Sequence, residues 1–282
     1  MLNKIGAMQG RLLPKYQGRY QAHPLGYWKP EFEIARELGL DLIEFILDYD
    51  NASQNPLMNR SGIDEIRRIS EYTGVGVLTV CADYFMEAPL HHQDPVVSGE
   101  SCRILKRLIH NCALIGVSDI VIPCVDGSSF ENEASMERLT RNIRPVRDLA
   151  ETAGIRLALE TDLPPEIFVQ LLATLDSGIF TVNYDTGNSA ALGYQPEVEI
   201  AAYGSRISDI HLKDRLRSGH SVELGDGDTD FGLFFDSLAR LGYTGPLIMQ
   251  AYRDDEGITV FKKQLEWILP QIKNRFDRIR SL

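Results

Sequence analysis

Paired cysteines, long apolar runs and an excess of positive charge are all missing from this chain of 282 residues. Its four cysteines form no C-x-x-C pair and no zinc-finger spacing, so reduced thiols are expected in place of disulfides. No segment approaches the roughly 20 consecutive apolar residues of a membrane helix, and the opening "MLNKIGAMQGRLLPK" is too short and too interrupted for a signal peptide. These absences predict a cytoplasmic protein with no membrane partner.

A basic surface is missing as well, because the formal net charge is −11. Nucleic-acid binding depends on basic residues that release counterions from phosphates, so no nucleic-acid partner is expected. The G-x-G-x-x-G pattern of dinucleotide-binding sheets does not follow the first expected strand. What is present is a globular composition, with 44% hydrophobic and 24% charged residues, which supports a sizeable core.

Short apolar runs rich in β-branched residues alternate with longer amphipathic segments along the chain. Eight strands are expected, at residues 4–9, 40–46, 74–81, 119–125, 155–161, 179–185, 207–212 and 246–252. Helices are expected at residues 30–39, 61–73, 98–115, 133–153, 165–175, 231–241 and 257–280. Glycines stand where four of the helices should end in a left-handed cap, at Gly74, Gly116, Gly154 and Gly242. This alternation predicts an α/β fold with a parallel sheet covered by helices, and eight repeats favour a (β/α)8 TIM barrel forming a single domain over residues 1–282.

Chemistry in such a barrel belongs at the carboxyl ends of the strands. From the second strand to the eighth, these ends carry polar or ionisable side chains: Glu44, Asp83, Asp126, Glu160, Asp185, His211 and Gln250. Any one of them alone would be ordinary, since an isolated aspartate at a strand end commonly caps the next helix. The whole series predicts a functional site at the mouth of the barrel.

Four of these residues, Glu160, Asp185, His211 and Gln250, come from neighbouring strands and are expected to converge. Two carboxylates, an imidazole and an amide oxygen form an oxygen-rich donor set that suits Mn²⁺, Mg²⁺ or Co²⁺, and less specifically Zn²⁺. A core histidine bonded to the backbone is the alternative for His211, but its place in "SDIHLKDR", directly before charged residues, indicates a strand exit. We therefore expect a divalent metal ion at these four side chains.

Several segments resemble the sugar-phosphate isomerase/epimerase superfamily of xylose isomerase-like barrels. They are "GLDLIEFILD" (39–48), "LETD" (159–162), "NYDTGNSAA" (183–191), "DIHLKD" (209–214), "LGDGDTDFGLFFDSL" (224–238) and "GYTGPLIMQAY" (242–252). Their D-T-G-N, H-L-K-D and G-D-G-x-x-D-F patterns are most similar to those of the L-ribulose and L-xylulose 5-phosphate 3-epimerases. The resemblance covers most of the chain.

This resemblance implies that the metal ligands fall on Glu160, Asp185, His211 and Gln250. It also implies that the first and last of these positions are catalytic, because both are proton-moving glutamates in the epimerases. Glu160 matches that pattern and Gln250 departs from it. Asn188 stands where sugar-contacting members often carry histidine, although the sugar-phosphate epimerases share the asparagine.

The glutamine at position 250 bears directly on the reaction. Inversion at C3 of a ketose needs one base to remove a proton and an acid on the opposite face to return one, and a glutamine can do neither. Either another carboxylate, such as Glu44, Asp83 or Asp254, takes that role, or the enzyme is an aldose–ketose isomerase in which Glu160 alone passes a proton between adjacent carbons. Both outcomes describe a metal-dependent sugar isomerase or epimerase working through an enediolate.

The residues expected to contact substrate are Asn188, Lys213, Arg215, Arg217, Glu44, Arg11 and Arg253. Most are basic and suit a phosphorylated sugar, since arginine grips phosphate with two donors and lysine acts as a point charge. A solvated surface run is the alternative for Arg215 and Arg217. The acidic, glycine-rich segment at 225–232 is a poor phosphate cradle and is expected to be a turn leading into a helix.

Other function classes also fit parts of the sequence. A barrel that lost catalysis and binds sugars would account for Gln250. An abasic-site endonuclease on the same kind of barrel is disfavoured by the acidic charge and by too few strand-end histidines for a trinuclear zinc site. Aromatic residues in the long segments 11–28 and 82–95 are expected to screen the barrel mouth, to form a small core or to meet a second copy in a homo-oligomer.

Overall fold

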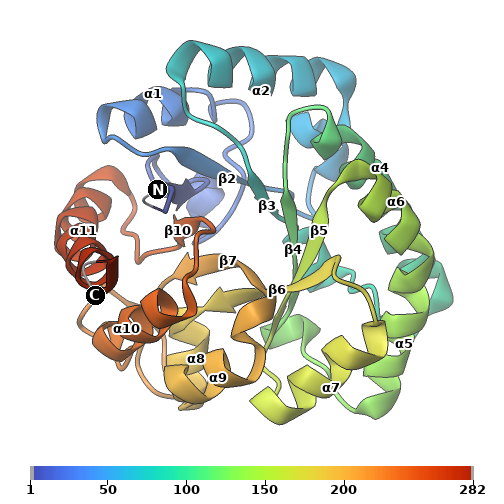
Figure 1. Cartoon of the computed structure of the whole chain (residues 1–282). Helices are drawn as coiled ribbons and strands as arrows, with labels where there is room; N and C mark the ends of the chain where they lie inside the picture. Colours follow the sequence, from blue (N-terminus) through green and yellow to red (C-terminus); the bar gives the residue numbers. More distant parts are fainter. Residues whose placement is uncertain (1–2, 281–282) are drawn as a thin grey trace.

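The computed structural model describes residues 3–280 and contains a closed barrel of eight parallel strands in the order β1-β10-β7-β6-β5-β4-β3-β2 (Figure 1). The strands are β1 (Ile5–Met8), β2 (Leu42–Ile46), β3 (Thr79–Cys81), β4 (Asp119–Cys124), β5 (Arg156–Thr161), β6 (Phe180–Asp185), β7 (Ile207–Leu212) and β10 (Leu247–Met249). The expected TIM barrel is therefore confirmed. Within the described part of the chain, no helix combines the length and apolar character needed to cross a membrane.

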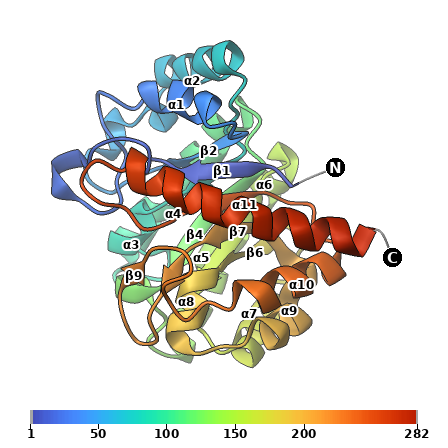
Figure 2. The same ribbon diagram turned by 90° about the vertical axis from the view of Figure 1, so that its left-hand side faces the viewer.

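Helices surround the barrel as an outer layer, and α11 crosses the outside of β1 in the view of Figure 2. They are α1 (Pro30–Glu37), α2 (Arg60–Thr73), α3 (Tyr84–Glu87), α4 (Pro95–Ala113), α5 (Glu133–Ile143), α6 (Arg147–Ala153), α7 (Pro165–Leu175), α8 (Thr186–Leu192), α9 (Pro196–Tyr203), α10 (Phe231–Leu241) and α11 (Ile258–Arg280). Most of the apolar core lies between these helices and the strands, while a smaller cluster fills the barrel itself. The chain thus buries two layers of apolar side chains around one sheet.

Proline and glycine set several boundaries of these elements. The helix expected over 133–153 is divided, because Pro145 has no backbone N–H to continue it and a short 3-10 turn (Arg144–Val146) separates α5 from α6. Gly74, Gly154 and Gly242 cap α2, α6 and α10 with positive φ angles of 77°, 67° and 75°, as expected. The strand expected over 74–81 was too long, since β3 begins only at Thr79.

A two-stranded hairpin, β8 (Asp214–Arg215) with β9 (Ser221–Val222), follows β7 and leads into the acidic loop. The buried carboxylate of Asp214 accepts hydrogen bonds from three backbone N–H groups of this loop, at Gly225, Gly227 and Thr229 (2.8, 2.9 and 3.1 Å). Asp230 then begins α10 by accepting a hydrogen bond from the N–H of Leu233. The expectation that this segment is a turn leading into a helix is confirmed.

Candidate active site

A cavity of about 410 Å³ opens at the carboxyl ends of the strands. Its wall includes Gln21, Asp83, Glu160, Asn188, Lys213 and Gln250, which come from the loops and strand ends of six different βα units. Tyr20 and Arg19, from the long segment 11–28, also reach this wall. The cavity therefore lies where the barrel fold predicts chemistry.

Three of the four expected metal ligands meet beside this cavity. Glu160 on β5, Asp185 at the end of β6 and His211 on β7 each offer a ligand atom, and these atoms lie within 4.8 Å of one another. All three side chains are buried. Gln250, directly after β10, lines the same cavity as Glu160.

The imidazole of His211 is held by a second carboxylate. Its Nε2 lies 2.8 Å from Glu44 Oε1, and its Nδ1 lies 3.0 Å from the side-chain amide nitrogen of Asn183. Asn183 donates its N–H, so Nδ1 carries the lone pair and Nε2 carries the proton that Glu44 accepts. Nδ1 also lies 3.7 Å from Glu160 Oε2, and a metal ion bound at Nδ1 would replace Asn183 as the partner of its lone pair. The pairing of Nε2 with Glu44 resembles the carboxylate–histidine pairs that orient metal ligands.

Two free oxygen atoms test whether a metal ion fits here. Oδ1 of Asp185 accepts a hydrogen bond from the backbone N–H of Asn188 and caps α8, but its buried Oδ2 accepts no hydrogen bond among the described residues and has only Lys213 Nζ nearby, at 3.6 Å. Gln250 donates from Nε2 to Gln21 Oε1 (3.0 Å), while its own Oε1 is likewise buried and unpartnered. Buried polar atoms rarely remain unsatisfied. Two such oxygens in the expected ligand set fit a hard divalent cation.

A second group of ligand types, Glu44, Cys81 and His211, also lies within 4.8 Å. It suits a metal less well. Burial raises the pKa of the Cys81 thiol well above its ordinary value, and the nearby carboxylates of Asp83 and Glu44 add to this rise, so the sulfur stays protonated. The Nε2 of His211 is already engaged with Glu44. The group containing Glu160 is the better candidate.

Burial raises the pKa of the Glu160 carboxyl to about 7, an effect that His211 opposes and Asp185 reinforces. Two amides hold this carboxyl in place. Asn188 Nδ2 donates to Oε1 (2.7 Å), and Asn183 Nδ2 donates to Oε2 (3.2 Å). A carboxyl with a pKa near neutrality can both accept and return a proton at physiological pH.

Two expected substrate-binding cations lie on the cavity wall. Arg215 Nη1 donates to Asn188 Oδ1 (2.9 Å), and Lys213 Nζ lies 3.5 Å from the same oxygen and 3.6 Å from Asp185 Oδ2. Both are partly exposed to the cavity. Asn188 thus connects the cations to Glu160 through the two ends of one amide.

Four other residues expected to contact substrate do not line this cavity. Arg11 and Arg253 are 1% and 2% exposed, and both are occupied with backbone carbonyl groups, so they brace the loops after β1 and β10. Arg217 is exposed and lies beside Gly193, outside the cavity wall. Glu44 is fully buried, outside the cavity wall, where burial raises its pKa to about 7 and its Oε1 holds the imidazole of His211.

Two site residues had no signal in the sequence. Asn183 lies within β6, where its side chain points into the barrel between Glu160 and His211. Gln21 belongs to a long irregular segment, and nothing in its neighbourhood indicates that it reaches Gln250. The aromatic residues of that segment divide in role, since Tyr20 lines the cavity whereas Trp28 packs on Phe45 in the main apolar core.

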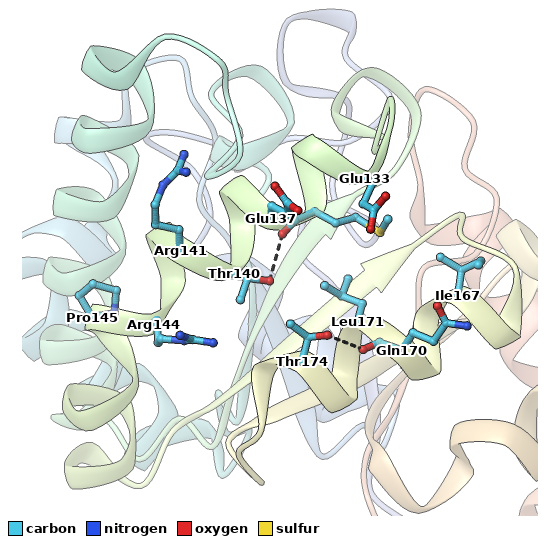
Figure 3. Close-up of a pocket in the computed structure, with 11 residues that line it drawn as sticks. Glu133, Glu137, Thr140, Arg141, Arg144, Pro145, Ile167, Gln170, Leu171 and Thr174 are labelled. Carbon is cyan, nitrogen blue, oxygen red and sulfur yellow. Dashed lines mark hydrogen bonds between the residues drawn. The ribbon is translucent and has the colours of Figure 1, made fainter.

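A groove of about 700 Å³ lies on the outer wall of the barrel between α5 and α7 (Figure 3). The two threonine hydroxyls drawn there bond back to their own helices, Thr140 to the carbonyl of Met136 (3.0 Å) and Thr174 to that of Gln170 (2.9 Å). The groove lies on the outer helices, away from the strand ends where a barrel of this kind places its chemistry. It is not the candidate active site.

Comparison with known proteins agrees with this fold. The family model described as "Xylose isomerase-like TIM barrel" matches residues 32–271. L-ribulose-5-phosphate 3-epimerase UlaE of Escherichia coli strain K12 is 24% identical over 259 residues, which cover 86% of this chain and 88% of that protein.

Solved structures give the same architecture. The structure of an L-ribulose 3-epimerase superimposes with a TM-score of 0.78 at 16% identity, covering 99% of this chain and 98% of the other. D-psicose 3-epimerase from Clostridium cellulolyticum H10, solved with D-tagatose, has a TM-score of 0.73 at 18% identity, covering 99% and 98%. Together with the match over residues 32–271, the closed eight-stranded barrel shows that this chain belongs to the xylose isomerase-like TIM barrel family.

Proposed function

We propose that this protein is a divalent-metal-dependent ketose epimerase or isomerase that moves a proton at a carbon next to the ketose carbonyl. One observation carries the proposal. Glu160, with a pKa raised to about 7, lies within 4.8 Å of Asp185 and His211 beside a cavity at the strand ends. The relatives named above, which act as 3-epimerases by their names, support the same reaction class.

The metal site would consist of Glu160, Asp185, His211 and Gln250. Their donor atoms are mostly oxygens, so Mn²⁺, Mg²⁺ or Co²⁺ is favoured over Zn²⁺. When bound, such an ion supplies Lewis acidity that makes the proton beside a carbonyl easier to remove. The unpartnered oxygens of Asp185 and Gln250 are the structural support for this assignment.

Glu160 would be the proton-transfer residue. Its carboxylate takes the proton from the carbon, the electron pair of the broken C–H bond forms the double bond of an enediolate, and the acid then returns a proton. Asn188 and Asn183 fix both of its oxygens, which keeps the carboxylate in one orientation during the transfer. A catalytic group that is already held in its reactive orientation increases the reaction rate, because less entropy is lost on reaching the transition state.

A phosphorylated ketose is the substrate that the cavity favours. Lys213 and Arg215 line its wall and share the side-chain oxygen Oδ1 of Asn188, which a phosphate oxygen could replace as their partner. The chain has a formal net charge of −11, so two cations on the cavity wall are a local exception that favours an anionic substrate there. L-ribulose 5-phosphate is the first compound to test, because the relative at 24% identity is named for it.

The test is solvent-deuterium incorporation into a panel of ketoses and ketose phosphates, followed by NMR with Mn²⁺ present. The parent should incorporate deuterium at a carbon flanking the carbonyl, and Glu160→Gln should slow that exchange by about 10²–10⁴-fold for a substrate whose exchanging proton faces Glu160. Glu166→Gln, the same chemical change at an exposed position on α7, is the matched control and should exchange at the parent rate. A parent that binds sugars but exchanges none of them would favour a sugar-binding barrel instead.

A further inference from the structure

Three side chains form a hydrogen-bonded chain across one side of the cavity. Gln21 accepts from Gln250 Nε2 at its Oε1 (3.0 Å) and donates from its Nε2 to Asp83 Oδ2 (2.8 Å). We call Gln250, Gln21 and Asp83 the amide bridge. It joins the loop after β3 to the end of β10, and all three members line the cavity.

Few carboxylates could return a proton to a substrate here. Glu44 is fully buried behind His211, and Asp254 is exposed, outside the cavity wall, with Oδ1 accepting from the N–H of Gly257. Glu87 and Asp126 line the cavity but are exposed at its rim. Asp83 is partly buried and held at both oxygens.

The second contact of Asp83 comes from Cys81, whose Sγ lies 3.1 Å from Oδ1. Each carboxylate oxygen still has a free lone pair after these contacts, so the group can take up or release a proton while it remains oriented. β3 and β5 are separated in the barrel by β4, so Asp83 and Glu160 face the same cavity from different directions.

We propose that Asp83 is the second proton-transfer residue, placed by Gln21, and that it takes the role that Gln250 cannot perform. The assignment rests on the proposed ketose epimerase function. It makes the reaction an inversion with two proton-transfer groups, and it excludes an isomerisation served by Glu160 alone.

The proton balance of the inversion follows directly. Glu160 as carboxylate removes the C3 proton from one face, and the electron pair of that bond forms the C2–C3 double bond of the enediolate. Asp83 as carboxylic acid delivers its proton to C3 on the other face, which re-forms the carbonyl and leaves Asp83 ionised. Exchange of both groups with water resets the enzyme, and the reverse reaction uses the two groups in exchanged roles.

The experiment measures exchange and inversion separately in D₂O with Mn²⁺. The substrates are both C3 epimers of the ketose or ketose phosphate that the parent converts fastest. In Asp83→Asn, inversion should fall by about 10²–10⁴-fold in both directions. The epimer whose C3 proton faces Glu160 should still exchange, while the other should not. Glu160→Gln should show the reciprocal pattern.

Controls separate a chemical role from a structural one. Asp254→Asn should invert at the parent rate, and Asp83→Glu should recover part of the inversion lost in Asp83→Asn. Loss of exchange for both epimers in Asp83→Asn, with unchanged thermal stability, would overturn the assignment, because it would mean that Asp83 only shapes the cavity. Inversion at the parent rate in Asp83→Asn would refute the role of Asp83 and leave the proposed function standing. A parent protein that converts no ketose would overturn both the proposed function and this assignment.

Discussion

The amide of Gln21 has one orientation that satisfies all its neighbours. Its Oε1 accepts from Gln250 (3.0 Å) and from Arg11 Nη2 (2.9 Å), and its Nε2 donates to Asp83 (2.8 Å). Replacing Gln250 by glutamate would set a carboxylate oxygen against the oxygen of Gln21. Rotating the Gln21 side-chain amide by about 180° would not remove this repulsion, because its oxygen would then face the carboxylate of Asp83. We therefore predict that Gln250→Glu destabilises the metal-free protein, and that Asp83→Asn relieves part of that cost.

The magnitude follows from burial. Gln250 is 5% exposed, so a carboxylate there cannot regain its hydration. An unsatisfied buried polar group costs about 1–3 kcal/mol and a charged group more, which predicts a loss of about 3 kcal/mol in the free energy of unfolding for Gln250→Glu. In the double variant, Gln21 can turn over, donating to the new glutamate and accepting from the new asparagine. The contact with Arg11 is then lost, so the expected coupling energy is about 2 kcal/mol.

The assay is a double-mutant cycle by urea denaturation with EDTA at pH 8, using the parent, Gln250→Glu, Asp83→Asn and the double variant. Gln170→Glu, at an exposed position on α7, is the control for adding a carboxylate and should change stability by less than about 0.5 kcal/mol. Mn²⁺ should stabilise Gln250→Glu more than the parent, because the variant adds negative charge to the metal site. Additivity of the two single changes within about 0.5 kcal/mol would refute the reasoning.

Three further predictions concern the metal, the substrate and pH. His211→Ala should abolish stoichiometric Mn²⁺ binding in equilibrium dialysis while the circular dichroism spectrum is kept, and unchanged metal content would contradict the assignment. Lys213→Ala should raise KM for a phosphorylated ketose by roughly ten- to a hundredfold, the loss of a charge-assisted hydrogen bond of about 1.5–3 kcal/mol, with little effect on the free sugar. An equal effect on both forms would place the phosphate elsewhere. Burial lowers the pKa of His23 to about 3, so its ring should not titrate between pH 8 and 5 by NMR. Because the unfolded chain takes up that proton below about pH 6.5, this histidine should lower stability as the pH falls from 6.5 towards 3. A ring that titrates near pH 6.5 would contradict this.

The barrel could be predicted from sequence because its strands are short, apolar and regularly spaced. The structure departs from expectation where local chemistry overrides that pattern, as at Pro145, which divides the expected helix over 133–153. α8 and α9 had not been expected, because "TGNSAAL" and "PEVEIAAY" are too short to show a helical period. Asp185 begins α8 as its N-cap, so the capping role and the candidate metal role fall on the same carboxylate.

The sequence predicts the candidate site only for residues at or near the carboxyl ends of the strands. Glu160, Asp185 and His211 could be grouped because neighbouring parallel strands end at the same edge of the barrel. The positions of the basic side chains are harder to predict, because the charge of a residue does not indicate in which direction its side chain points. Arg11 and Arg253 turn toward backbone carbonyl groups instead of the cavity. Gln21 could not have been found, since it reaches the site from an irregular segment with no periodic pattern.

The amide bridge also gives a reason for the glutamine at position 250. Gln250 meets the oxygen end of the Gln21 amide and Asp83 meets its nitrogen end, so in this geometry Gln21 is compatible with one donor and one carboxylate, and not with two carboxylates. In this chain the carboxylate is at position 83 and the donor at position 250. The two positions should therefore vary together in the family. Relatives that keep a glutamine matching Gln21 and carry glutamate in place of Gln250 should have a neutral residue in place of Asp83. Several relatives with Gln21 retained and carboxylates at both positions would contradict this explanation.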